Sequence, residues 1–273
     1  MMLLGKVKVP EGITESTFTC TREGLAIGGK VFRKEGENMP IAIVCHGFMA
    51  WQDSVRNYAI RLAEMGYAAF TFDFNGGSVM RSKSEGKTTD MSVLTEVRDL
   101  EAVIEYVRTL PYVNPDSILQ MGCSQGGFVS ALVAAKNKYP ITKLCLFYPA
   151  LCIPDDARAG KMMMAKFDPN QVPEILRCGF MKLGKQYVTD VLHMDPFEEI
   201  KGYEGEVLIV HGDRDKIVDY SYGQRAYEAY LAYNPLGLPA EKRAQLCCIE
   251  KGAHGFSKKL DRIAIDALKK WLL

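Results

Sequence analysis

The 273-residue chain carries 34 Lys and Arg residues against 33 Asp and Glu residues, and 48% of its residues are hydrophobic. A chain of this length can bury one large core, and α/β folds of this size often form one domain. With a net charge of only +1, the protein has no strong overall electrostatic field that would attract nucleic acid or an anionic membrane. We therefore expect a small-molecule partner, no nucleic acid and no membrane, and leave open whether the chain forms a homodimer.

The beginning of the chain, MMLLGKVKVPEG, has too short an apolar stretch for a signal peptide. No later run reaches the roughly 18 apolar residues that suggest a membrane span. We therefore expect a cytoplasmic protein. The eight cysteines show no C-x-x-C spacing, and several lie in apolar runs typical of strands. Reduced, buried thiols are expected in preference to disulfides or a metal site.

Apolar runs of strand length alternate with longer segments of helical period, which predicts the α/β class with a mostly parallel sheet and helices on both faces. Residues 16–20 and 25–32 open as an antiparallel pair, because their short link leaves no room for a crossover helix. The later strands are predicted at residues 41–47, 67–74, 117–122, 141–148, 206–212 and 244–250, and the helices at 54–65, 91–110, 124–138, 221–233 and 258–272.

The alternation breaks down between residues 151 and 204, where four prolines and only short helical patches occur. Regular alternation returns with the strand at 206–212. We therefore predict one core domain, formed by residues 1–150 and 205–273, with residues 151–204 inserted into it.

A candidate nucleophile lies between a predicted strand and a predicted helix, in the sequence Gly122-Cys123-Ser124-Gln125-Gly126. This segment matches G-x-S-x-G, a turn so sharp that bulky residues two positions from the serine would collide. Ser124 is the predicted nucleophile, because its hydroxyl stands at a helix N-terminus that favours developing negative charge. Cys123 is a chemical rival, but its side chain is expected to point back into the fold.

A serine hydroxyl needs an imidazole to accept its proton, and the imidazole needs a carboxylate to fix its tautomer. The chain has four histidines, His46, His193, His211 and His254. Only His254, in a glycine-flanked loop before the last helix, follows the acid candidates in the order Ser, acid, His. It is the predicted base. Asp213 and Asp215 both follow the predicted strand at 206–212 and are the acid candidates.

Acyl transfer also needs two N–H donors aimed at the tetrahedral oxyanion, each worth roughly 3 kcal/mol. The backbone amide of Gln125, directly after the nucleophile, is one predicted donor. The amide of Phe48, in the His46-Gly47-Phe48 segment that ends the third predicted strand, is the other. His46 itself is interpreted as a structural residue that packs this loop.

Seven short motifs extend over nearly the whole chain: HGF, FDFNG, SEGK, MSVLTEVRD, GCSQGG, HGDRD and GAHGF. With them the sequence resembles the bacterial cinnamoyl or feruloyl esterases of the α/β-hydrolase superfamily. The resemblance implies the α/β-hydrolase fold and no cofactor or metal. It also implies an acid loop H-G-x-x-D-x-x-V in which the second carboxylate faces the histidine. Asp215 is therefore the preferred acid, and Asp213 the alternative.

In the family that the sequence resembles, the insertion caps the pocket and binds the phenolic ring of the acyl group. An acidic side chain near its start holds the ring hydroxyls, and Asp156 stands at about that place. A later tyrosine shares this task in some members. Here Met181 follows Gly179 and Phe180 instead, and the nearest tyrosine is Tyr187. Asp156, Met181 and Tyr187 are the predicted substrate-binding residues.

The insertion is also rich in flexible apolar side chains that can mould to a planar ring. They are Met162, Met163, Met164, Phe167, Phe180 and Met181. The alternative is that these residues form a small core of the insertion itself and that Asp156 caps a helix.

The leading hypothesis is a serine carboxylesterase that acts on hydroxycinnamoyl esters through an acyl-enzyme. The same residues serve amides and many acyl chains, so an exopeptidase or a general short-chain or lipase-like acyl esterase is the alternative. A non-catalytic binding module on the same fold is a remote third hypothesis, because such proteins usually lack a member of the triad.

Overall fold

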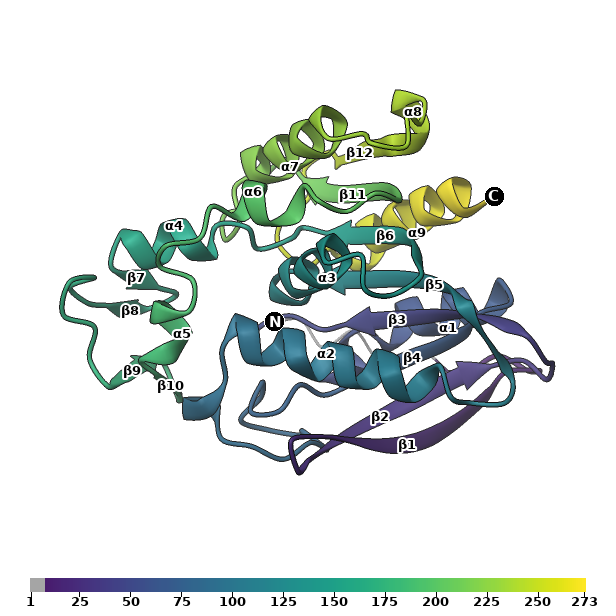
Figure 1. Cartoon of the computed structure of the whole chain (residues 1–273), viewed down its shortest axis with the longest axis horizontal. Coiled ribbons are helices and arrows are strands. Elements are labelled where there is room, and N and C mark those ends of the chain that lie inside the picture. The colour runs from purple at the N-terminus through teal and green to yellow at the C-terminus, as the bar shows by residue number, and fades with distance from the viewer. Residues whose placement is uncertain (1–7) are drawn as a thin grey trace.

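The alternating pattern folds, in the computed structural model, into one eight-stranded sheet with strand order β1-β2-β4-β3-β5-β6-β11-β12 (Figure 1). The structure describes residues 8–273. The strands β1 and β2 pair antiparallel, as do β2 and β4, and every other neighbouring pair is parallel. The strands of this sheet are β1 (Thr14–Arg22), β2 (Leu25–Arg33), β3 (Met39–Cys45), β4 (Ala68–Phe72), β5 (Val113–Cys123), β6 (Ile141–Phe147), β11 (Glu206–Gly212) and β12 (Ala244–Ile249).

Helices cover both faces of the sheet (Figure 1). One face packs against α2 (Val93–Val107), α3 (Gln125–Ala135) and α7 (Tyr220–Ala232). The other face packs against α1 (Arg56–Glu64) and α9 (Lys258–Leu272). The short helices of the core are η1 (Gln52–Ser54), η2 (Thr88–Asp90) and α8 (Ala240–Arg243). The predicted α/β class is confirmed by this arrangement.

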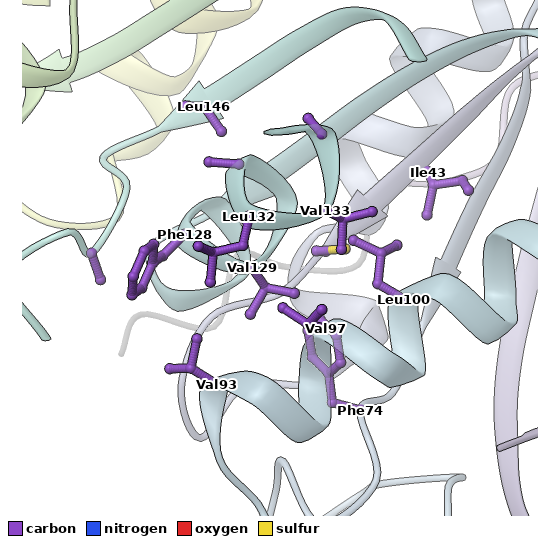
Figure 2. Packing of buried hydrophobic residues seen from close by; sticks show 14 of the residues in the cluster. Ile43, Phe74, Val93, Val97, Leu100, Phe128, Val129, Leu132, Val133 and Leu146 are labelled. Carbon is purple, nitrogen blue, oxygen red and sulfur yellow. The ribbon is translucent and has the colours of Figure 1, made fainter. Parts of the chain in front are cut away.

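The core consists of two apolar layers because side chains along a strand alternate between the faces of the sheet. In β3, Ile41 and Ile43 enter the layer under α2 and α3, whereas Ala42 and Val44 enter the layer under α1 and α9. In α2 the apolar side chains recur every three or four residues and meet those of α3, as Figure 2 shows. The residues labelled there are Ile43, Phe74, Val93, Val97, Leu100, Phe128, Val129, Leu132, Val133 and Leu146.

The segment between β6 and β11 departs from the sheet pattern and lies beyond the end toward which the parallel strands point (Figure 1). Its elements are α4 (Ile153–Arg158), β7 (Lys161–Met162), β8 (Ala165–Lys166), β9 (Ile175–Cys178), β10 (Met181–Gly184), α5 (Gln186–Thr189) and α6 (Pro196–Ile200). The sequence predicted short helical patches here but not the two antiparallel hairpins, β7–β8 and β9–β10. Strands of two and four residues are too short to produce a visible period. The role of this insertion as a cap stays a prediction.

The eight cysteines are free thiols, six of them buried, with Cys247 partly exposed and Cys248 exposed. No helix within residues 8–273 is both long enough and apolar enough to cross a membrane.

Candidate active site

Ser124 lies at a sharp turn between β5 and α3, with φ 54° and ψ −122°. A non-glycine residue at such angles is strained, and the structure around it must hold it there. A Cβ added to Gly122 would lie 2.1 Å from the carbonyl oxygen of Gly126, and one added to Gly126 would lie 2.2 Å from that of His46. The two glycines of the motif are therefore needed for the close approach of β3, β5 and α3.

The neighbouring thiol of Cys123 is buried in the layer under α1 and α9. Burial raises the pKa of this thiol, so that the thiolate form is disfavoured. Ser124, by contrast, is partly exposed. The geometry therefore presents the serine hydroxyl, and not the thiol, at the end of the sheet.

Three side chains from separate loops form one hydrogen-bonded chain. The Nε2 atom of His254 lies 2.9 Å from the Oγ atom of Ser124, and its Nδ1 atom lies 2.7 Å from Oδ2 of Asp215. Because a carboxylate only accepts, the hydrogen on Nδ1 points to Asp215 and Nε2 is left to accept from the serine hydroxyl. The structure brings together the three residues that the sequence singled out.

Asp215 is surrounded by hydrogen-bond donors. Its Oδ1 atom accepts from the amides of Ile217 and Val218 at 2.9 and 3.0 Å. Burial alone would raise the pKa of Asp215, but hydrogen bonds from His211, His254 and Val218 lower it well below the usual carboxyl range. Asp215 is therefore ionised at neutral pH and can stabilise an imidazolium at His254. The alternative acid, Asp213, is exposed.

None of the other three histidines forms a hydrogen bond with Ser124. The ring of His46 accepts from the amide of Phe74 at Nε2 and donates to the carbonyl of Gly47 at Nδ1, and burial lowers its pKa. His211 is fully buried, with Nε2 3.0 Å from the carbonyl of Val218. His193 is exposed in the insertion.

Two backbone amides lie beside the serine. A Cβ added to Gly47 would lie 2.9 Å from Cβ of Ser124, so the loop after β3 directly touches the nucleophile elbow. The next amide along the chain is that of Phe48, and no group among residues 8–273 accepts a hydrogen bond from it. Gln125 is the first residue of α3, and the first amides of a helix have no partner within it. The two residues predicted to supply the oxyanion donors thus flank the serine: Gln125 follows it directly, and Phe48 follows Gly47, which touches it.

Tyr148 is a neighbour of the site that the sequence analysis missed. Its ring packs edge-on against His254, with ring centroids 4.8 Å apart, and Phe256 packs behind it at 5.1 Å. Its place directly after β6, at the same edge of the sheet as the other loops, was the available signal. No motif marks it.

The predicted substrate-binding residues differ in exposure. Asp156 is partly exposed, and burial raises its pKa. It lies within α4, whose N-cap is Cys152, so it is not the helix cap considered above. Met181 has no exposed surface. Tyr187 is buried, and its hydroxyl donates to Oε1 of Gln125 at 2.5 Å.

The flexible apolar side chains of the insertion differ in burial, and Phe167 is partly buried against the core. Met162 and Met181 are buried in the apolar cluster that the insertion shares with the sheet face under α2 and α3, rather than in a separate small core. Met163, Met164 and Phe180 are exposed at the hairpin turns. No group of three or more His, Cys, Asp or Glu side chains within residues 8–273 could hold a metal ion.

Residues 36–190 match the family model described as serine aminopeptidase, S33, which extends over more than half of the chain. The chain belongs to this family. Two curated relatives are alpha/beta hydrolase domain-containing protein 17C from Xenopus tropicalis and from Homo sapiens, 26% and 24% identical over 159 residues. The match covers 58% of this chain but only 41% and 38% of those proteins.

Among solved structures, Est1E from Butyrivibrio proteoclasticus with ferulic acid bound is similar, with a TM-score of 0.82 and 27% identity over 93% of this chain and 97% of that one. Alpha/beta hydrolase domain-containing protein 10 from mouse has a TM-score of 0.72 at 15% identity, over 94% and 98% of the two chains, and shows the fold alone. The predicted α/β-hydrolase fold and the resemblance to bacterial feruloyl esterases are confirmed. These findings support a hydrolase with a small-molecule substrate.

Proposed function

We propose that this protein is a serine carboxylesterase that hydrolyses hydroxycinnamoyl esters through an acyl-enzyme intermediate. The observation that carries the proposal is the chain of hydrogen bonds from Ser124 through His254 to Asp215, at 2.9 and 2.7 Å, beside two backbone amides. The similarity to Est1E with bound ferulic acid supports the choice of acyl group.

Each part of the site has a step in the proposed reaction. The Oγ atom of Ser124 attacks the ester carbonyl carbon while Nε2 of His254 takes the hydroxyl proton. The carbonyl electrons move onto oxygen, where the amides of Phe48 and Gln125 donate to the oxyanion. On collapse, His254 gives its proton to the departing alcohol. Water then attacks the acyl-enzyme by the same steps, which releases the acid and restores Ser124.

The ionised state of Asp215 favours this route. Because its pKa lies well below the usual carboxyl range, it remains negative when His254 becomes positively charged. The charge pair at 2.7 Å then stabilises the transition state without a second proton transfer.

Selection of the acyl group is assigned to the insertion. Asp156 is partly exposed near the start of the insertion, burial raises its pKa, and its carboxyl oxygens can accept a hydrogen bond from a hydroxyl group. Such a group can hold a phenolic hydroxyl. Tyr187 and Met181 are buried, so we assign them a structural role in the insertion.

An exopeptidase is the second candidate, favoured by the serine aminopeptidase description of the matching family. The same acid could then bind a free α-amino group, which is a cation. The triad geometry does not distinguish the two, because amides and esters share the tetrahedral intermediate.

A substrate panel tests the proposal. We expect kcat/KM for methyl ferulate to exceed that for 4-nitrophenyl butyrate and for an aminoacyl anilide, with 4-nitrophenyl acetate as a small-acyl reference. Anilide cleavage that exceeds every ester would favour the peptidase. Equal rates on ferulate and butyrate would favour a general acyl esterase.

A further inference from the structure

One tyrosine of the insertion touches both residues whose amides flank Ser124. The Tyr187 hydroxyl donates to Oε1 of Gln125 at 2.5 Å. Its ring packs against Phe48, with centroids 5.6 Å apart and planes inclined by 49°. Tyr187 is 3% exposed, and burial keeps its pKa well above the ordinary value, so the hydroxyl remains a donor.

The Gln125 carboxamide is held from a second side by α2. Because its oxygen accepts from Tyr187, its Nε2 faces Sδ of Met91 at 3.9 Å and the buried carboxyl of Glu96. Gln125 is 1% exposed, so its side chain has little room to move. A fixed carboxamide on the first residue of α3 restrains the direction of that residue's own N–H.

The segment that carries Tyr187 is itself anchored to the core. Asp190 follows α5 directly and accepts from the hydroxyl of Ser92 at 2.5 Å. Ser92 is the N-cap of α2, and its hydroxyl also accepts a hydrogen bond from the amide of Thr95. Within four residues, therefore, the insertion is bonded to the start of α2 and to the start of α3.

We propose that Tyr187 is a positioning residue of the oxyanion hole, which orients Gln125 through its hydroxyl and Phe48 through its ring. This inference rests on the proposed roles of Ser124, Phe48 and Gln125. An oxyanion forms with every acyl group, so the contribution of Tyr187 is the same for all substrates and is expressed in kcat. A residue that reads the substrate would instead affect only the substrates it contacts.

The first test is Tyr187→Phe, which removes the hydroxyl and keeps the ring against Phe48. We expect kcat to fall about tenfold on both methyl ferulate and 4-nitrophenyl acetate, with KM changed less than about twofold. The matched control is Tyr203→Phe. Tyr203 is equally buried and donates to the carbonyl of Ile141, at the opposite end of β6 from the site, so its loss should leave kcat unchanged. A loss confined to ferulate, or confined to KM, would overturn the positioning role.

The second test is a double-mutant cycle with Gln125→Ala, which removes the carboxamide and keeps the backbone amide. If the hydroxyl acts through Gln125, adding Tyr187→Phe to Gln125→Ala should lower kcat less than about twofold further. A full tenfold loss in both backgrounds would show that the hydroxyl acts by another route and would contradict the inference.

The third readout separates this inference from the proposed function. A fluorophosphonate probe places a phosphoryl oxygen in the same hole, so the rate constant for labelling Ser124 should fall about tenfold in Tyr187→Phe whatever the natural substrate is. If the wild type is labelled but hydrolyses no ester, the proposed esterase function is refuted. The ratio of the labelling rates of Tyr187→Phe and the wild type then still tests the positioning role of Tyr187. Equal labelling of wild type and Tyr187→Phe would refute the positioning role alone. A wild type without a label on Ser124 would refute both.

Discussion

Two carboxylates near the site, Asp215 in the core and Asp156 in the insertion, have opposite electrostatic environments. Burial acts against ionisation in both. In Asp215 it is outweighed by hydrogen bonds from His211, His254 and Val218, which lower the pKa. In Asp156 it prevails over Lys161 and Cys152, and the pKa is raised. The difference teaches that the environment of Asp215 favours a fixed negative charge, whereas the environment of Asp156 disfavours one.

The first and largest effect is expected when the proposed nucleophile of the core, Ser124, is removed. Ser124→Ala should lower kcat/KM by about 10⁵-fold or more on every ester, because no acyl-enzyme can form. The partly exposed hydroxyl contributes little packing, so the melting temperature should stay within a few degrees of the wild type. Activity that persists in this variant would place the chemistry elsewhere in the molecule.

The second effect is expected when the core carboxylate is neutralised. Asp215→Asn should lower kcat about 10⁴-fold, because an amide at this place favours the wrong tautomer of His254. Asp213→Asn is the matched control, since Asp213 is exposed two residues away. It should retain activity within about twofold. If the control lost more activity than Asp215→Asn, the assignment of the acid would have to be exchanged.

The third effect is expected when the carboxylate of the insertion is removed. Asp156→Ala should lower kcat/KM for methyl ferulate by an amount that corresponds to about 1 to 3 kcal/mol of activation free energy, the cost of a hydrogen bond left unmade. Activity on 4-nitrophenyl acetate should barely change, because it has no ring hydroxyl. Asp155→Ala is the control, since Asp155 is already bonded to Tyr222 and Arg158. Equal losses of Asp156→Ala on both substrates would show that Asp156 supports the structure alone.

The fourth prediction extends the comparison to the buried carboxyl of Glu96. Burial raises the pKa of Glu96 to about 8, against an ordinary value of 4.5, and the Gln125 side chain offsets this only in part. Between these two pH values the unfolded chain loses this proton while the folded chain keeps it. The protonated Glu96 therefore contributes fully to the free energy of unfolding below pH 4.5. This contribution is lost as the pH rises through 8, by at most about 1.4 kcal/mol per pH unit.

Glu96→Gln should remove this loss, so that the variant gains free energy of unfolding relative to the wild type as the pH rises from 4.5 to about 8. Urea unfolding at several pH values measures the difference. Glu228→Gln, at an exposed position of α7, is the control and should show a constant difference. A constant difference in Glu96→Gln would show that Glu96 ionises normally in the fold.

Much of the core could be predicted from the sequence because it follows local rules. The strands and helices of the sheet follow their periods of two and 3.6 residues, and the elbow needs Gly122 and Gly126 on either side of Ser124. The order of serine, acid and histidine then left His254 as the base. The choice between Asp213 and Asp215 came from resemblance alone, and the geometry favours the same residue.

The insertion was less predictable because its structure depends on distant contacts. The bond between Tyr187 and Gln125 joins residues 62 positions apart, and that between Asp190 and Ser92 joins residues 98 apart. Neither leaves a local pattern. The burial of Met181 likewise depends on how β9 and β10 pair, and strands of four residues show no clear alternation.

The nucleophilic role of Ser124 is the central claim, and peptide mapping after reaction with a fluorophosphonate tests it most directly. The proposal predicts a single modified peptide in the wild type, with the phosphonyl group on Ser124, and no modified peptide in Ser124→Ala. A label on Cys123, or equal labelling of Ser124→Ala and the wild type, would contradict it.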